Sequence, residues 1–197
     1  MWWLFAPRPT HGKEVLRELG HVRTTRISEV ADGARRMISG TAELAGPPAI
    51  AGLTGRPCCG WVVTIDEVGM GESVQRGVVV EGVPFIVRDA SGHARVLPDR
   101  ARIGVPGHIV LRHPRHALLD DERALYTQLG VLLNYPDTSK LRFTERVILP
   151  GAPVRVYGYC QREPDRAAMD ADVSGYRGDV PTRPVLSSTR RAPLLIG

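Results

Sequence analysis

An alternating stretch between Val83 and Pro98, VPFIVRDASGHARVLP, restricts the fold of this chain more than any other part of the sequence. Apolar residues occupy every second position on both sides of the polar sequence Asp89-Ala90-Ser91-Gly92. A period of two is typical of a strand with one buried face, and a D-x-S-G sequence gives the backbone freedom to reverse direction. The stretch therefore predicts a β-hairpin.

Composition and patterning extend this β-rich prediction to most of the chain. The 197 residues are enough for one full core, and the 21 glycines and 16 prolines favour short strands and turns over long helices. Gly40 lies inside the first of the other predicted strands and indicates a bulge or coil there. These further strands cover residues 36–44, 58–68, 74–80, 141–149 and 154–161.

Two helices are predicted where apolar residues follow a helical period. A short helix covers residues 13–19 and ends at Gly20, and a longer one covers residues 118–133. The longer helix begins with Asp120, Asp121 and Glu122, which suit the positive end of a helix dipole. Toward the end of the chain, the pattern predicts a loop over 162–179 and short edge strands, or part of a tail, over 185–187 and 194–196.

Three of these pieces occur in the order of an OB-fold, which is a five-stranded barrel. They are the glycine-containing strand ISGTAEL, the hairpin FIVRDASGHARV and the turn and strand LPGAPVRVYG, with a helix between the second and the third. We expect a mainly β protein with one helix, an OB-like β-barrel elaborated with an extra β-hairpin and a C-terminal loop. The expected organisation is an N-terminal segment with a short helix (1–33), the barrel domain (34–162), and a C-terminal loop with edge strands or a tail (163–197).

The chain also resembles the BAM or GIDE domain, the "beside a membrane" domain of Mulan-type RING ubiquitin ligases and their bacterial and plant relatives. The resemblance covers residues 34–162 and is carried by short motifs in a fixed order. Its residues are Gly40-Thr41-Ala42, the stretch Leu53 to Cys58 with Trp61, then Phe85, Asp89, Ser91, Gly92, Val96 and Pro98, and finally Glu145, Leu149, Gly151, Val156 and Gly158.

The resemblance implies a non-enzymatic binding or regulatory module that engages a protein partner. It places that partner in a membrane-associated or a stress or defence assembly. We expect the protein in the cytoplasm or at the cytoplasmic face of a membrane. Ligase activity is not implied, because a RING needs about eight Cys or His ligands and the cysteines Cys58, Cys59 and Cys160 cannot supply them. An accessory protein related to ubiquitin ligases, without its own RING, is a further alternative. No cofactor is expected.

The three cysteines indicate a reducing compartment. Cys58 and Cys59 are adjacent, and no C-x-x-C spacing occurs. We therefore expect reduced and mostly buried thiols.

Arginine supplies almost all of the positive charge behind the formal net charge of +5. Two explanations of this excess stay open. One is coding bias, and the other is a surface that binds polyanions, since the guanidinium fork suits phosphate. An OB-type binder of single-stranded nucleic acid is therefore the main alternative to a protein-binding module. Trp61 and Phe85 are expected in the core. The candidate binding residues on the barrel face are Arg56, Arg88, Arg95, Arg155 and Tyr157.

Metal binding has one weak candidate group, the histidines His108, His113 and His116. His113 and His116 flank Pro114, so they do not share one face of a helix. A solvated loop that leads into the acidic start of a helix is the favoured interpretation, and no metal site is expected.

Catalysis has two candidate groups, and a structural interpretation is favoured for both. Cys58 lies near Arg56, which would suit a thiol of lowered pKa, but a buried structural cysteine is the more common case. Asp66 and Glu67 are neighbours on a predicted strand, so their side chains point to opposite faces and do not form an acid and base pair.

No apolar stretch approaches the roughly 20 residues that a membrane span needs. The segment Met1 to Phe5 is apolar but short, and no cleavage motif follows it, so it does not predict a signal peptide. Packing on the domain and peripheral contact with an interface or a membrane surface are both open for this segment.

Overall fold

The computed structural model describes residues 12–68, 73–106, 109–114, 120, 124, 127, 140–165, 168 and 180–197. Within them the protein is mainly β, with one α-helix, α1 (Gly12–Gly20), and one 3-10 helix, η1 (Ile27–Glu29). Asp120, Ala124 and Thr127 are also helical, and the rest of the helix predicted over 118–133 lies outside the described residues. No helix of the described residues is long and apolar enough to cross a membrane.

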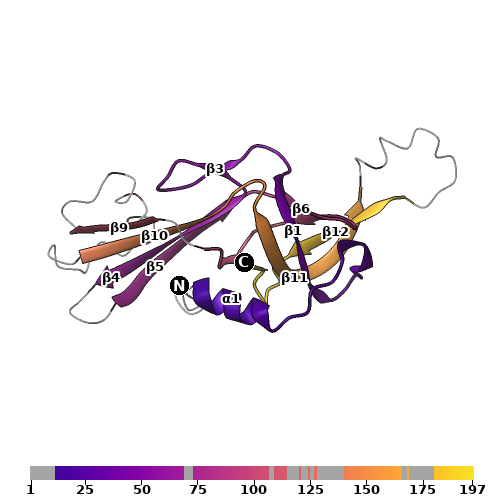
Figure 1. Ribbon diagram of the computed structural model, residues 1–197, viewed down its shortest axis with the longest axis horizontal. Coiled ribbons are helices and arrows are strands. Elements are labelled where there is room, and N and C mark those ends of the chain that lie inside the picture. Colours follow the sequence, from indigo (N-terminus) through magenta and orange to yellow (C-terminus); the bar gives the residue numbers. More distant parts are fainter. Residues whose placement is uncertain are drawn as a thin grey trace.

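Five strands close into a barrel, as the sequence predicted (Figure 1). Around the barrel they follow the order β1 (Arg35–Leu44), β6 (Phe85–Asp89), β7 (Gly92–Val96), β12 (Thr182–Ser187) and β11 (Pro153–Pro164), and β11 pairs with β1 again. Only β7 and β12 are parallel; the other four pairings are antiparallel. This is the OB-like barrel, and the hairpin predicted around the D-x-S-G turn forms β6 and β7.

The predicted edge strands near the end of the chain were a wrong expectation, because both strands have neighbours on each side. β12 pairs with β7 through Val185↔Arg95 and with β11 on its other side. β13 (Leu195–Ile196) lies between β11 and β8 (Arg102–Ile103). These pairings join residues far apart in sequence, so they leave no local pattern. The C-terminal segment thus completes the barrel.

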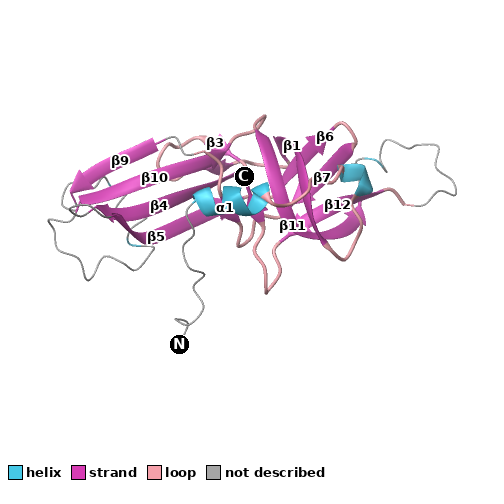
Figure 2. Ribbon diagram, turned by 60° about the horizontal axis from the view of Figure 1, so that its bottom comes forward, coloured by secondary structure: helices cyan, strands magenta, loops and turns pink. Residues whose placement is uncertain are grey.

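A second sheet lies beside the barrel in Figure 2. It contains the predicted extra hairpin and two further strands. The hairpin is β4 (Gly60–Val68) and β5 (Ser73–Gly82), and the sheet continues from β4 through β10 (Lys140–Ile148) to β9 (Ile109–Pro114). The solvated loop predicted around His113 is in part this strand, because His113 belongs to β9. A separate short hairpin of β2 (Ala49–Ile50) and β3 (Pro57–Cys58) precedes this sheet.

The change of pairing partner along β1 explains why Gly40 lies within this strand. The strand pairs with β11 up to Thr41 and with β6 from Thr41 onward, so it crosses from one neighbour to the other directly after Gly40. A Cβ at Gly40 would overlap the backbone carbonyl of Arg88. Outside the barrel, α1 packs Val15 and Leu19 against Met37 of β1. The core itself is filled by apolar residues that include Ile38, Phe85, Val87, Val96, Val156 and Leu186.

Candidate functional site

The five residues predicted to bind do not converge on one surface. Arg88 and Arg95 project from the outer face of β6 and β7, because their neighbours Val87 and Ala94 fill the barrel core. Arg56 is exposed in the loop that connects β2 to β3. Arg155 and Tyr157 lie on β11, which neighbours neither β6 nor β7. Two separate faces of the barrel are therefore involved. Tyr157 packs with the residues under α1.

A groove of about 560 Å³ lies on the face that carries Arg95. Its volume is within the range of pockets that bind small ligands or short segments of chain. It is the best candidate site, because residues of four barrel strands, and the residue that follows a fifth, meet around it. Its lining residues are Ala45, Ile86, Arg95, Glu163, Pro164 and Arg183.

Two arginines in this groove share one carboxylate. Glu163 accepts a hydrogen bond from Arg95 Nη1 at 3.3 Å through one oxygen and is contacted by Arg183 Nη2 at 2.7 Å through the other. The three side chains come from β7, β11 and β12 and are only partly exposed. With two guanidinium groups and one carboxylate, this group carries one excess positive charge.

Arg88 and His93, on the same outer face, also contact acids. Arg88 contacts Glu43 of β1 at 2.8 Å, and this hydrogen bond lowers the pKa of Glu43 and raises the pKa of Arg88. His93 Nε2 lies 3.0 Å from the buried carboxylate of Asp165. The face therefore has far less unpaired positive charge than its arginines suggested from sequence.

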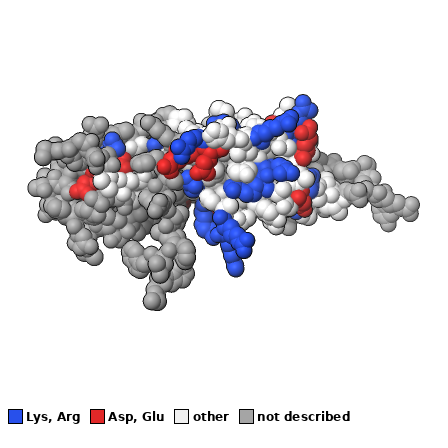
Figure 3. Space-filling view, turned by 90° about the horizontal axis from the view of Figure 1, so that it is seen from below, with Lys and Arg blue, Asp and Glu red and all other residues white. Residues whose placement is uncertain are grey.

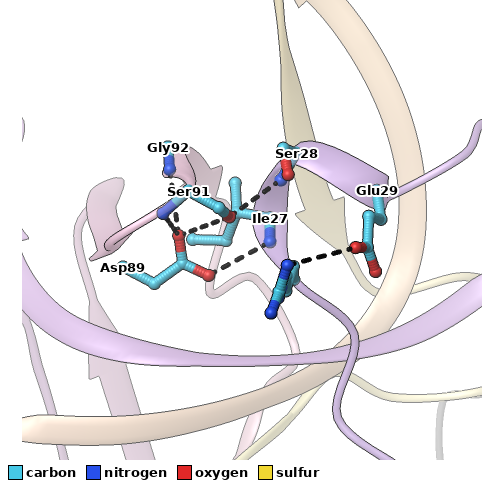
Figure 4. Close-up of polar contacts among 7 residues, drawn as sticks. Ile27, Ser28, Glu29, Asp89, Ser91 and Gly92 are labelled. Carbon is cyan, nitrogen blue, oxygen red and sulfur yellow. Dashed lines mark hydrogen bonds and ion pairs between the residues drawn. The ribbon is translucent and has the colours of Figure 1, made fainter.

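The D-x-S-G turn is a structural device, as Figure 4 shows. One oxygen of Asp89 accepts hydrogen bonds from the N–H groups of Ser91 and Gly92 and from the Ser91 hydroxyl. The other oxygen accepts one from the N–H of Ile27, and Ser91 Oγ accepts one from the N–H of Ser28. The turn thus fixes η1, whose Ile27 is buried in the barrel core.

Glu145 is a second buried carboxylate that sequence reasoning placed in a motif but not in any site. Its side chain is 1% exposed on β10. It accepts hydrogen bonds from the N–H of Leu53 at 2.7 Å and from the hydroxyl of Thr54 at 2.6 Å. Two of the motifs behind the family resemblance therefore meet here, and their contact holds the loop between β2 and β3.

Asp66 belongs to an ion pair across the second sheet. Arg142 lies directly opposite on β10 and donates from Nη2 to Asp66 at 2.9 Å. Burial lowers the pKa of nearby Arg146, and the charge of Asp66 opposes that effect. The side chain of Asp66 thus has a structural partner on the neighbouring strand.

The environment of Cys58 does not suit the nucleophile hypothesis. Burial raises the pKa of Cys58, Cys59 and Cys160 to about 11 each, the opposite of the lowered pKa that a reactive thiol needs. All three are free, buried thiols, as the sequence predicted.

The histidine group predicted as a weak metal site is described only in part. His108 and His116 lie outside the described residues, as do Asp121 and Glu122, and His113 is described only by its place in β9. In the part of the chain that the structure covers, no three His, Cys, Asp or Glu side chains come together as metal ligands.

Comparison of the chain with family models, with curated proteins and with solved structures finds no match. The resemblance to the BAM or GIDE domain therefore stays a prediction from the sequence motifs.

Proposed function

We propose that this chain is a binding module that holds an extended, acid-bearing peptide segment of a protein partner in the groove between β6, β7, β11 and β12. The observation that carries the proposal is the single carboxylate, Glu163, shared by Arg95 and Arg183. A carboxylate from a partner would find two guanidinium groups that one acid only partly neutralises.

The position of the groove supports the same proposal. In the barrel order, β6 and β7 are the second and third strands, and OB barrels bind oligonucleotides and oligosaccharides, which are also extended chains, on the face of these two strands. Such ligands are also bordered by the segments after the first and the fourth strand. Here Ala45 follows β1 and Pro164 ends β11, and both line the groove.

A peptide suits this face better than a nucleic acid. Binding of a single strand needs unpaired basic residues along the backbone and aromatic rings for the bases. On this face Arg88, Arg95, Arg183 and His93 all contact acids, and none of the described residues that line the groove is aromatic. Ile86 and Pro164 instead offer apolar contacts beside the charges.

The kind of assembly follows from the resemblance alone. A partner in a membrane-associated assembly on the cytoplasmic side, or one linked to ubiquitin ligases, is the proposal that the BAM or GIDE motifs add. The chemistry of the groove supports only the class of ligand.

The proposal is tested by selecting random displayed peptides on the immobilised full chain and measuring the affinity of the enriched sequences. We expect Asp or Glu next to apolar residues, and a loss of affinity of at least about tenfold in the double variant R95A/R183A. The matched control R26A/R56A removes the same charge from exposed positions outside the groove and should keep the affinity. Equal losses in both double variants, or no enriched peptide, would contradict the proposal.

A further inference from the structure

A second surface of the barrel carries arginines that have no acidic partner. We call it the helix-side face; it consists of α1, the outer sides of β1 and β11, and the turn 188–193. Among the described residues, none of its arginines forms an ion pair, in contrast to those around the groove. They are Arg17, Arg35, Arg155, Arg190 and Arg191.

Figure 3 views the molecule from the side on which α1 lies in Figure 1. Lys and Arg atoms form larger groups than Asp and Glu atoms over the barrel half of this view. Because unpaired surface charges add to a common potential, this face is the part of the described protein best suited to a polyanion.

Two tyrosines lie among these arginines. The guanidinium of Arg35 sits 4.2 Å from the ring centroid of Tyr157. Tyr159 lies directly opposite Arg35 in the β1–β11 pairing and is half-buried. Arg35, the first residue of β1, therefore lies next to both rings, which come from the middle of β11.

The turn with the two neighbouring arginines lies close to this cluster. Tyr159 pairs with Ser187, the last residue before the turn, and Arg35 Nη2 donates a 2.8 Å hydrogen bond to the carbonyl of Pro193 at its far end. The turn is closed by a hydrogen bond from the N–H of Thr189 to the carbonyl of Ala192. Arg190 and Arg191, both exposed, are therefore held beside Arg35 and Tyr159.

We infer that the helix-side face binds single-stranded nucleic acid, with the phosphates on Arg35, Arg190 and Arg191 and a base stacked on Tyr159. Basic residues alternating with aromatic rings are the combination that sequence-independent binding of single strands uses. This site and the proposed peptide groove share β11 but no residue, because Tyr159 lies in the middle of that strand and the groove is lined by Glu163 and Pro164 at its end.

An anionic membrane is the competing polyanion, and the apolar residues of the described part of the chain do not favour it; the segment Met1 to Phe5 lies outside the described residues. Peripheral binding to a bilayer uses exposed apolar side chains together with basic ones. The exposed large apolar residues of the described chain are absent from α1, from β11 and from the turn 188–193, and the one on β1, Leu44, is at the opposite end of that strand from Arg35. They are Leu44, Ile50, Val74, Val80 and Val180.

The test is the fluorescence anisotropy of a labelled single strand of about twelve nucleotides, titrated with the full chain at several salt concentrations. We expect R190A/R191A to weaken binding at low salt by at least about tenfold and to make the salt dependence shallower by about 1.4, which is about 0.7 for each lost phosphate contact. The matched control R56A/R88A removes the same charge elsewhere and should keep both values close to those of the unmodified protein.

A second pair of variants tests the stacking. Tyr159→Leu removes the aromatic face and should weaken binding at least about fivefold, whereas Tyr159→Phe keeps the ring and should restore it. Circular dichroism and the unfolding midpoint establish that each variant is folded.

Three results would overturn the inference. They are the absence of binding at low salt, equal losses in R190A/R191A and R56A/R88A, or equal affinity of the Leu and Phe variants at position 159. Binding to vesicles of phosphatidylcholine and phosphatidylserine that exceeds binding to the oligonucleotide would assign the face to a membrane instead.

Discussion

The backbone N–H of Leu53 donates a 2.7 Å hydrogen bond to the carboxylate of Glu145, which lies 92 residues later in the chain. The carboxylate is almost completely buried, and its second oxygen accepts a hydrogen bond from the hydroxyl of Thr54. A buried charge without such partners is costly. This contact therefore fixes the β2–β3 loop to β10.

Removal of this carboxylate should destabilise the protein. Glu145→Ala leaves the N–H of Leu53 and the hydroxyl of Thr54 without an acceptor, and we expect the free energy of unfolding to fall by about 2 to 4 kcal/mol. Glu145→Gln keeps one acceptor oxygen and should cost less. Urea denaturation measures both, with exposed Glu81→Ala as the control. A loss for Glu145→Ala no larger than for the control would contradict the assigned role.

The close approach of β1 to β6 predicts a second effect on stability. Gly40→Ala places a Cβ on the backbone carbonyl of Arg88, which cannot move away as the end of a flexible side chain could. We expect a loss of at least about 2 kcal/mol in the free energy of unfolding. Gly46→Ala is the matched control, because its Cβ would meet nothing within 4 Å. Equal stabilities of the two variants would show that β1 does not cross β6 this closely.

The D-x-S-G turn predicts a dependence of stability on pH. Desolvation alone would raise the pKa of Asp89, but the hydrogen bonds from Ser91, Ile27 and Gly92 outweigh it, so the pKa lies below its ordinary value. A lowered pKa in the folded state means that Asp89 stabilises the fold above the unfolded value of about 3.9, and that this stabilisation is lost as the pH falls through the folded value.

The variant Asp89→Asn isolates this contribution. Near neutral pH we expect it to cost about 1 to 2 kcal/mol, because its NH₂ group faces the N–H of Ile27 or Ser91 in place of an acceptor. The difference from the unmodified protein should shrink when urea denaturation is repeated below about pH 3.9. A difference that stays constant across this range would contradict the assignment.

We expect the buried cysteines to react slowly with thiol reagents in the folded state. Because burial raises the pKa of Cys58, Cys59 and Cys160 to about 11, their thiols stay protonated near neutral pH. A thiol reagent such as Ellman's reagent should react with none of them quickly in the native protein and with all three in urea. A rapid reaction of Cys58 with the reagent in the native protein would contradict this prediction and would support the nucleophile hypothesis.

The same thiols should also affect stability at high pH. An unfolded cysteine ionises near pH 8.5, whereas the folded thiols ionise near 11, so the unfolded state binds fewer protons between these values. Stability contributed by the thiols is therefore complete below about pH 8.5 and is lost as the pH rises toward 11. Urea denaturation of the C58A/C59A variant should show a smaller loss over this window.

Local sequence patterns predicted the strands that they encode. Pairings between strands far apart in the sequence could not be predicted from them. The hairpin of β6 and β7 is encoded by alternation around one turn, so the sequence predicted it with its turn residues. β12 joins β7 in parallel across about 90 residues of sequence, and no local signal marks such a partner. The same reason explains why β12 and β13 resembled edge strands.

The candidate groove was predictable only through Arg95. Its position on an outward face followed from the alternation of the hairpin. Glu163 and Arg183 fell in a segment predicted as a loop or tail, because their pairing depends on β11 and β12 lying next to each other. Arg88 was a candidate binding residue, and its ion pair with Glu43 could not be predicted, because Glu43 comes beside it only when β1 pairs with β6.

The central claim is that the groove formed by β6, β7, β11 and β12 receives a carboxylate from a peptide. The most direct measurement is calorimetric titration of a selected acidic peptide into the unmodified chain and into Glu163→Gln. Because Glu163 competes for the guanidinium groups of Arg95 and Arg183, its neutralisation should tighten binding by about fivefold. An affinity that is unchanged or weaker in Glu163→Gln would contradict the claim.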